Sequence, residues 1–438
     1  MADDNGPLPS GRFARFTRIA SLAGRSAGDL ALGRAKKWFG GSSEGDELRA
    51  AKRVLETLGE LKGAAMKLGQ QLAMEADALP PEARDLVTKL YAGAPPMPFA
   101  TVREVVEDEL AEPLSTSFRH FEQTALASAS LGQVHRAVLH DGTSVAVKVQ
   151  YPGVAAAVES DLRNVALLVK ALPASTFKGL DTERYADEIR RELAAETDYL
   201  REASLARAYA QALAPFGGDI RVPVVYERHS TKRLLTMAFV DGVPLHVFAA
   251  SDAPAEARWR VGRQLALALL GPFVREGLIH ADPHPGNFLV RPDGGLTVLD
   301  FGAVKQLSPS FVEGFWGLLM AACRGRQPEF LERMTLAGYS FTGDVDQAVR
   351  NLETIHEVAG RPVQSETYDW GSCTMVPELR RRFVGDFSEW LQIQPPPEGL
   401  MFFRALGGLA NNMRLLRASG PYRALCLELD TLRTSAAR

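Results

Sequence analysis

Four polar side chains of this 438-residue chain are of types that together handle a phosphate ester and a divalent cation. Lys148 ends an apolar run, Asp282 and Asn287 lie five positions apart in a loop that two prolines stiffen, and Asp300 follows thirteen residues after Asn287. A lysine can hold phosphates, an aspartate can accept a proton, and carboxylate and amide oxygens suit Mg²⁺. In this order the four residues predict chemistry on a nucleotide phosphate.

The loop His280-Ala-Asp-Pro-His-Pro-Gly-Asn287 also permits a second interpretation. His280, Asp282 and His284 alternate, and side chains of these types could hold a transition metal. The loop alone favours neither interpretation. The segment Asp300-Phe-Gly302 favours the first, because protein kinases use a catalytic-loop aspartate, an asparagine and a following metal-binding aspartate in this order.

A β-hairpin is predicted to position Lys148. Residues 131–139 alternate loosely between apolar and polar side chains, and Asp141-Gly142 has the composition of a tight turn. Residues 144–150 form the returning strand. Lys148 therefore lies late in a strand whose neighbours are apolar.

A second hairpin is predicted after the loop. Residues 288–290 and 296–299 read as short strands joined by Pro292-Asp-Gly-Gly295. This hairpin would bring Asp300 beside Asn287, so that both could bind one Mg²⁺ ion.

The rest of the chain predicts mostly helices. Residues 235–242 read as a strand that leads into a connection, where the backbone near Met237, Ala238 and Val240 could read the edge of adenine. A strand is expected at 222–226, and a capping box is expected to start a helix at Thr101 and at Ser310. Helices are expected at 47–90, from Thr101, at 155–214 with a break near Pro173, and over much of the chain after Pro254.

Composition limits the function classes. The formal net charge of −3 argues against a nucleic-acid partner, which would require a basic excess. The three cysteines, Cys323, Cys373 and Cys426, are too far apart for a zinc motif or a disulfide framework. No apolar run reaches the roughly 18–20 residues that span a bilayer, and no secretory signal is recognised. We expect a cytoplasmic protein without a transmembrane helix.

The N-terminal part is strongly basic between residues 12 and 38. Phe13, Phe16, Ile19 and Leu22 recur there at nearly helical spacing. One interpretation is an amphipathic helix on an anionic membrane surface, which would make the protein peripheral. The alternative is a solvated helix docked on the main body. Residues 40–45 read as a flexible linker.

Four motifs make the chain resemble the UbiB family of atypical kinases, also called AarF-domain proteins. They are Lys67-Leu-Gly-Gln70, Ala127-Ser-Ala-Ser-Leu-Gly-Gln133, Glu196-Thr-Asp198 and the loop that ends at Asn287. The resemblance covers roughly residues 55–420. It implies an α+β, protein kinase-like fold of two lobes, with a small β-containing N-lobe, a mostly helical C-lobe and an N-terminal helical extension. The expected domains are a basic segment at 1–45, the extension at 46–117, the N-lobe with a helical insertion at 118–240 and the C-lobe at 241–438.

The resemblance also implies residue roles. Glu202 would pair with Lys148, and Asp282 would be the catalytic acid or base. Lys67 and Gln70 would lie over the active site near Glu196 and Asp198 as a gate. Asp198 and Glu202 lie four apart, on one face of a helix, where their charges repel unless a cation lies nearby. Glu159 and Asp161 are a competing acidic pair closer to Lys148 in the sequence.

Two features differ from ordinary protein kinases. The loop expected to cover the phosphates has alanines where glycines are usual, and alanine restricts the backbone, so the loop should have a different shape. The family resemblance implies that its nucleotide preference is altered. A helix beginning at Pro309 follows soon after Gly302, so no activation segment is expected. The residues expected to bind ATP or ADP are Ala127, Ser128, Ala129, Ser130, Gly132, Gln133, Lys148, Met237, Ala238 and Val240.

Three functions remain open from the sequence. The leading one is a Mg²⁺-dependent atypical kinase or ATPase in ubiquinone or other isoprenoid-lipid metabolism at a membrane surface, as the family resemblance implies. The second is a small-molecule phosphotransferase of the aminoglycoside or choline kinase type, whose catalytic loop is similar. The third is a nucleotide-gated scaffold without turnover.

Overall fold

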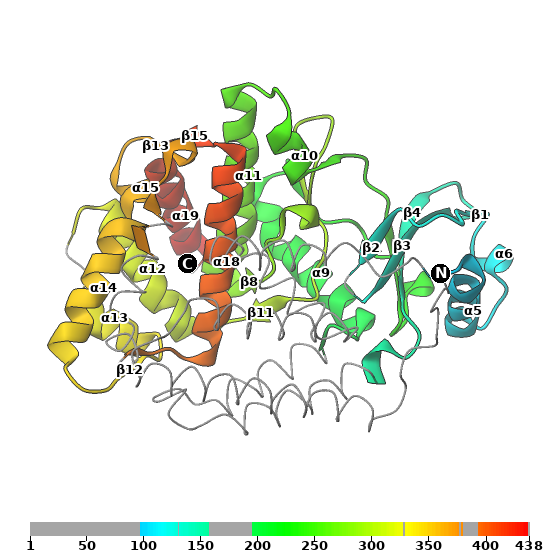
Figure 1. The fold of residues 1–438 in the computed structure, drawn as a ribbon, viewed down its shortest axis with the longest axis horizontal. Coiled ribbons are helices and arrows are strands. Elements are labelled where there is room, and N and C mark those ends of the chain that lie inside the picture. The colour runs from blue at the N-terminus through cyan, green and yellow to red at the C-terminus, as the bar shows by residue number, and fades with distance from the viewer. Residues whose placement is uncertain are drawn as a thin grey trace, which may run out of the picture. The chain divides into compact units, whose positions relative to one another are not determined.

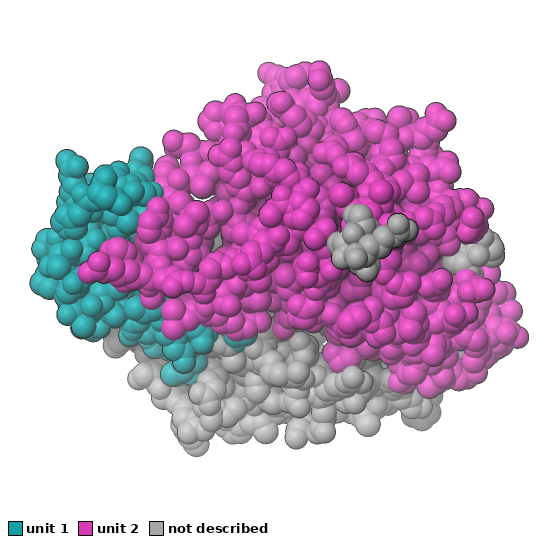
Figure 2. Space-filling view, turned by 180° about the vertical axis from the view of Figure 1, so that it is seen from behind, with its two compact units in different colours: residues 1–177, 185–198, 231–234 teal, residues 178–184, 199–230, 235–438 magenta. Residues whose placement is uncertain are grey.

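The chain forms two compact units, coloured separately in Figure 2. The first unit comprises residues 1–177, 185–198 and 231–234, and the second comprises residues 178–184, 199–230 and 235–438. The chain therefore passes between the units several times. The structure, a computed structural model, describes residues 97–129, 131–156, 195–326, 329–375, 378–379 and 393–436.

The described part of the first unit combines short helices with an antiparallel sheet (Figure 1). Its elements are α5 (Phe99–Leu110), α6 (Leu114–Ser117), β1 (His120–Phe121), β2 (Ala127–Ala129), β3 (Gly132–Val138) and β4 (Ser144–Gln150). Strand β3 lies between β1 and β4, and β2 also pairs with β3. The predicted hairpin is confirmed, because β3 and β4 pair from Gly132↔Gln150 to Val138↔Ser144 and Gly142 takes φ +88° in the turn.

Helix α5 supplies the apolar face that covers this sheet. Val102, Val105 and Val106 are buried on one side of the helix, and α5 contacts β4. The capping box predicted at Thr101 is wrong, because the helix begins two residues earlier, at Phe99. Pro98 occupies the N-cap and its carbonyl accepts the Thr101 N–H at 3.0 Å, so the rigid proline starts the helix without a side-chain cap.

The second unit is mainly helical, with several short strands. Its helices are α9 (Tyr199–Leu213), η2 (Ala214–Phe216), η3 (Glu227–His229), α10 (Leu245–Ala250), α11 (Ala255–Glu276), η4 (Pro285–Asn287), α12 (Pro309–Cys323), α13 (Phe330–Leu336), α14 (Val345–Ala359), α15 (Arg361–Gln364), η5 (Trp370–Ser372), α18 (Pro397–Leu416) and α19 (Tyr422–Ala436). Its strands are β5 (Ile220–Arg221), β6 (Leu234–Ala238, which begins in the first unit), β7 (Val243–Pro244), β8 (Leu278–His280), β9 (Phe288–Val290), β10 (Leu296–Val298), β11 (Val304–Gln306), β12 (Ser340–Phe341), β13 (Tyr368–Asp369), β14 (Ile393–Gln394) and β15 (Ser419–Gly420).

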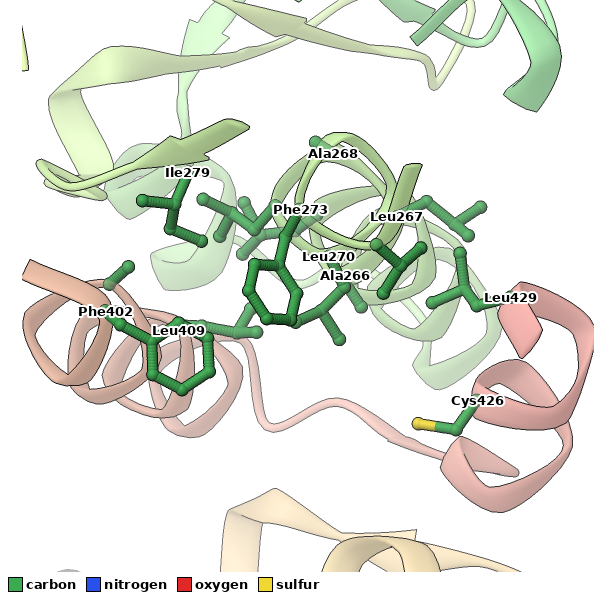
Figure 3. Packing of buried hydrophobic residues seen from close by; sticks show 14 of the residues in the cluster. Ala266, Leu267, Ala268, Leu270, Phe273, Ile279, Phe402, Leu409, Cys426 and Leu429 are labelled. Atoms are coloured by element: carbon green, nitrogen blue, oxygen red, sulfur yellow. The ribbon is translucent and has the colours of Figure 1, made fainter. Parts of the chain in front are cut away.

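Helix α11 is the centre of the core of the second unit (Figure 3). It contacts α9, α18 and α19, and its residues are buried almost continuously from Val261 to Val274. Phe273 packs against Phe402 of α18 with ring centroids 4.9 Å apart. Gly277 ends the helix with φ +66°, a conformation that glycine adopts without penalty. Within the described residues, no helix combines the length and apolarity needed to cross a membrane.

Two short sheets surround the predicted catalytic loop. Strands β5, β10, β9 and β7 form one sheet in that order, and β11 pairs with β8. The predicted hairpin at 288–299 is confirmed by the register Leu296↔Val290, with Gly294 at φ +79° in its turn. The strand predicted at 222–226 is wrong, since only Val225 forms an isolated bridge, to Met237. Pro223 lacks an N–H and cannot contribute to a continuous ladder.

Helix α12 begins at Pro309, as predicted, but its cap differs from the prediction. Ser308, and not Ser310, accepts the Phe311 N–H, at 3.3 Å. Glu313 lies too far along the helix to complete that cap and contacts Arg433 instead. The mixture of antiparallel sheet and helices confirms the α+β class.

Candidate active site

The loop expected to cover the phosphates belongs to the first unit. Ala127 and Ser128 are exposed in β2, and Ala129 is half-buried opposite Gly132. Ser130 lies outside the described residues. At Gly132 a Cβ would lie 2.1 Å from the carbonyl oxygen of Val149, so the backbones of β3 and β4 approach too closely for any other residue.

Gln133 and His135 form a buried polar pair beneath this loop. The Gln133 side-chain oxygen accepts the Met97 N–H, and its Nε2 lies 3.3 Å from Nε2 of His135. The other ring nitrogen of His135 lies 2.9 Å from the Glu122 carbonyl oxygen. Burial lowers the pKa of His135, which favours the neutral ring that this arrangement uses. The amide of Gln133 therefore holds the strand in place, and its contact with nucleotide stays a prediction.

Lys148 lies in β4, opposite Val134, and is 8% exposed. Gln150 lies two residues further along the same face of the strand. Its Nε2 donates to the carbonyl of Thr197 at 3.0 Å, and Thr197 is the central residue of the motif Glu196-Thr-Asp198. Within the first unit, Gln150 thus ties this acidic motif to the strand that carries the lysine.

The predicted catalytic loop, residues 280–287 of the second unit, is fixed by its own polar groups. His280 is fully buried, and its Nε2 lies 2.5 Å from the Asp300 carbonyl oxygen while its Nδ1 accepts the Asp282 N–H at 3.3 Å. Burial lowers the pKa of His280, so the ring is held neutral. His284 caps the turn η4 by accepting the Gly286 N–H at 3.1 Å.

Asn287 connects the two ends of this loop. Its Nδ2 donates to the Asp282 carbonyl at 2.9 Å, which leaves its Oδ1 as the atom that can serve as a metal ligand. The Leu299 N–H donates to the Asn287 carbonyl at 2.9 Å, where the β9–β10 ladder ends. Asp300 is the next residue, and its Oδ1 accepts the Gly302 N–H at 3.0 Å.

Side chains in the first turn of α9 contact the backbone of the Asp300-Phe-Gly302 segment. Glu202 is 3% exposed, and its Oε1 lies 3.5 Å from the Phe301 nitrogen, a long hydrogen bond. Arg201 donates to the Gly302 carbonyl at 3.2 Å. Two consecutive residues therefore set the path of the chain just after Asp300. The pairing of Glu202 with Lys148 stays a prediction.

The donor atoms in this region suit Mg²⁺ better than zinc. Asn287 and Asp300 offer amide and carboxylate oxygens, the hard ligands that Mg²⁺ prefers. Both ring nitrogens of His280 bond backbone groups, and Nδ1 of His284 accepts a backbone N–H. Among the described residues, no three side chains of His, Cys, Asp or Glu gather as a metal site.

The segment expected to read adenine lies at the end of β6. Met237 is buried with Tyr199, Ala203 and Leu235, whereas Ala238 and Val240 are half-buried. The Ala238 N–H donates to the Val224 carbonyl at 2.8 Å. A hydrogen bond from this segment to adenine would therefore use a backbone group other than the Ala238 N–H.

Three residues that support the site were missed by the sequence analysis. They are Gln150, Arg201 and Arg404, whose Nη2 lies 3.2 Å from Oδ1 of Asp282. Gln150 could have been found from its two-residue spacing to Lys148 on a strand. Arg404 lies 122 residues from its partner, and no local pattern connects them.

The predicted site residues are divided between the two units. Lys148, the phosphate loop, Glu196 and Asp198 belong to the first, while Glu202, Asp282, Asn287, Asp300 and the adenine segment belong to the second. Lys67, Gln70, Glu159, Asp161 and the basic segment 12–38 lie outside the described residues.

Comparisons with known proteins agree on the family. The model of the ABC1 atypical kinase-like domain matches residues 89–333. The rat protein named "Atypical kinase COQ8B, mitochondrial" is 32% identical over 409 residues, which are 89% of this chain and 75% of that protein. "Atypical kinase COQ8, mitochondrial" of Schizosaccharomyces pombe is 30% identical over 406 residues, 89% of this chain and 65% of that protein.

A solved structure, described as the complex of Rv3197 with erythromycin from Mycobacterium tuberculosis, has a similar fold. It superposes with a TM-score of 0.60 and 29% identity, over 87% of this chain and 96% of that one. The fold and the matched sequence together confirm the resemblance drawn from the motifs. The chain belongs to the ABC1 family of atypical kinase-like proteins, the UbiB family, and is an atypical kinase with a kinase-like α+β fold.

Proposed function

We propose that this chain is a Mg²⁺-dependent, ATP-using atypical kinase or ATPase that acts on a small or lipid-like molecule. The observation that carries the proposal is the connected loop of the second unit. Asn287 donates to the Asp282 carbonyl and, through its own carbonyl, accepts the N–H of the residue before Asp300. The three residues expected to carry the chemistry are thus joined by one short hydrogen-bond network.

Each residue has a role in this proposal. Asp282 would accept the proton of the attacking hydroxyl or water. Asn287 through Oδ1 and Asp300 through its carboxylate would hold Mg²⁺, which would neutralise charge on the phosphates. Lys148 would hold the phosphates, with Glu202 as its acidic partner. The convergence of Lys148 with the loop around one nucleotide is part of the proposal.

The segment after Gly302 supports a substrate other than a protein. It enters β11, where Val304 pairs with His280, and α12 begins at Pro309. Ser308 between them is fixed by Glu398, whose carboxylate accepts the Ser308 N–H at 3.0 Å and its hydroxyl at 2.8 Å. So short and constrained a segment offers a peptide little surface on which to dock.

The physiological substrate is proposed from the family resemblance, which implies ubiquinone or other isoprenoid-lipid metabolism at a membrane surface. Phosphate transfer to a soluble small molecule is a second candidate. The similar structure from Mycobacterium tuberculosis is described as a complex with erythromycin, a small molecule that carries hydroxyl and amine groups.

The proposal is tested by measuring ATP turnover with Mg²⁺, with and without anionic liposomes that contain an isoprenoid quinone. We expect turnover that liposomes stimulate and that Asp300→Asn reduces by on the order of 10² or more, because the metal ligand is weakened. Asp293→Asn, in the exposed turn of the same hairpin, is the matched control and should keep parental turnover.

Two outcomes would contradict this proposal in different ways. If the parent chain binds ATP but shows no turnover under any condition, the protein is a nucleotide-gated scaffold. If liposomes have no effect and a screen of soluble alcohols and amines finds a phosphate acceptor, it is a small-molecule phosphotransferase.

In parallel, the Lys67→Ala variant tests the predicted gate, whose loss should change turnover without changing protein stability.

A further inference from the structure

One face of helix α18 contacts the catalytic loop at three points. Arg404, Gly408 and Asn412 are spaced four residues apart, and residues at this spacing share one side of a helix. Each of them touches Asp282 or Pro283 of the loop. The function proposed above assigns no role in the reaction to these three residues.

Arg404 contacts the carboxylate that is proposed to accept the proton. Its Nη2 lies 3.2 Å from Oδ1 of Asp282, and the side chains are only 19% and 12% exposed, respectively. Hydrogen bonds between ionised groups are stronger than neutral ones and restrict the orientation of both partners. Shielding from water strengthens the effect. Arg404 therefore restricts the direction of the Asp282 carboxylate.

Gly408 and Asn412 fix the loop residue next to Asp282. A Cβ at Gly408 would lie 2.2 Å from Cγ of Pro283, so the proline ring packs directly on the helix backbone. Asn412 is fully buried, and its Nδ2 donates to the Pro283 carbonyl at 2.7 Å. A rigid proline held from both its ring and its carbonyl leaves Asp282 little freedom of backbone movement.

The beginning of α18 holds the other side of the site. Glu398, in the first turn, binds Ser308, which lies six residues after Gly302. Helix α18 also lies beside α11, the central helix of the unit (Figure 1). A single rigid element thus contacts both the loop that carries Asp282 and the segment that follows Asp300.

We infer that α18 positions the catalytic loop and that Arg404 is a positioning residue, acting on turnover through the orientation of Asp282. This inference rests on the proposed function, because it assigns Arg404 to the same reaction. A misplacement of about 1 Å can cost on the order of 10²-fold in rate. Loss of Arg404 should therefore lower kcat while ATP binding, which uses other residues, is retained.

The test compares kcat and KM for Mg·ATP in the full chain carrying Arg404→Gln, Arg404→Met or Arg404→Lys, with Arg414→Gln on the same helix as the matched control. We expect the Gln and Met variants to lose roughly 10- to 100-fold in kcat with KM within about twofold. The Lys variant should regain part of kcat, because one donor with a positive charge can still reach Asp282. Arg414→Gln should match the parent.

Thermal unfolding of each variant separates positioning from general damage. If Arg404→Gln does not fold, Arg404→Met, which keeps the aliphatic stem, has the same expected result. Parental kcat in the folded Gln or Met variant overturns the inference and leaves the proposed function standing. The inference is also overturned if Arg414→Gln shows the same loss of kcat, or if Arg404→Lys loses as much kcat as Arg404→Gln. If the parent chain itself fails to turn over Mg·ATP, the proposed function and this inference are overturned together.

Discussion

The hairpin of the first unit and the catalytic loop of the second achieve fixed positions by opposite means. The hairpin is held by backbone ladders, with β3 paired to β4 along its full length and β2 paired to β3. The catalytic loop has one short turn, η4, and is held by side chains that bond backbone carbonyls and N–H groups. The hairpin should therefore be sensitive to backbone shape, and the catalytic loop to the identity of its polar side chains.

The largest effect on stability is expected where backbone shape is most constrained. Gly132→Ala would place a Cβ 2.1 Å from the Val149 carbonyl oxygen, and a strand backbone cannot retreat as a flexible side chain can. We expect the free energy of unfolding to fall by about 2 kcal/mol or more, measured by urea denaturation.

Gly218→Ala is the matched control for that change, because nothing lies within 4 Å of the added Cβ. It should stay within about 0.5 kcal/mol of the parent. If Gly132→Ala were as stable as Gly218→Ala, the stability of the hairpin would not depend on the close approach of β3 and β4. The claim that the hairpin is sensitive to backbone shape would then be wrong.

The second change removes a side chain that fixes the catalytic loop. Asn412→Ala deletes the donor to the Pro283 carbonyl and leaves that buried oxygen without its partner. We expect a loss of about 1–2 kcal/mol in the free energy of unfolding, by the same urea denaturation. Asn411→Ala, at the exposed neighbouring position, should be neutral or slightly stabilising because alanine favours helix. Equal stability of the two variants would show that the loop does not depend on this side chain.

The smallest effect is expected from Ala129→Gly in the loop that is predicted to cover the phosphates. Ala129 lies opposite Gly132 where β2 meets β3, and glycine would restore the backbone freedom that the loop lacks. We expect a few-fold change in the ratio of ADP and ATP affinities, measured by titration calorimetry. Ala111→Gly is an alanine-to-glycine control in the same unit. Ala111 ends α5 with φ +55°, a conformation that favours glycine, so this change should raise stability and leave the ratio of ADP and ATP affinities unchanged. An unchanged ratio in Ala129→Gly would remove the connection between loop shape and nucleotide preference.

The elements that sequence predicted correctly depend on local signals. The turn at Asp141-Gly142, the hairpin that ends at Leu299 and the helix start at Pro309 each involve residues close together in the chain. The cap of α12 was mispredicted because two local signals competed. Ser308 and Ser310 both offered a cap beside Pro309, and Glu398, 90 residues from Ser308, supports the former.

Much of the candidate site could be named from residue types, but the supports that come from distant parts of the chain could not. The order of Lys148, Asp282, Asn287 and Asp300 could be read from their spacing in the sequence. The β9–β10 hairpin ends where Leu299, the residue before Asp300, bonds the carbonyl of Asn287. The contact of Arg404 with Asp282 joins residues 122 apart, and that of Asn412 with Pro283 joins residues 129 apart. Such contacts follow from how helices pack in three dimensions, and a periodic pattern in one helix does not specify its partner.

The place of α18 in the sequence has a practical consequence for anyone who shortens this protein. The family model ends at residue 333, whereas α18 spans Pro397–Leu416. A fragment cut at the model boundary would strip Asp282 and Pro283 of their partners in α18 and uncover the aromatic rings of Phe273 and Phe311 that Phe402 packs against. Inactivity or aggregation of such a fragment would therefore say nothing about whether the intact enzyme is active.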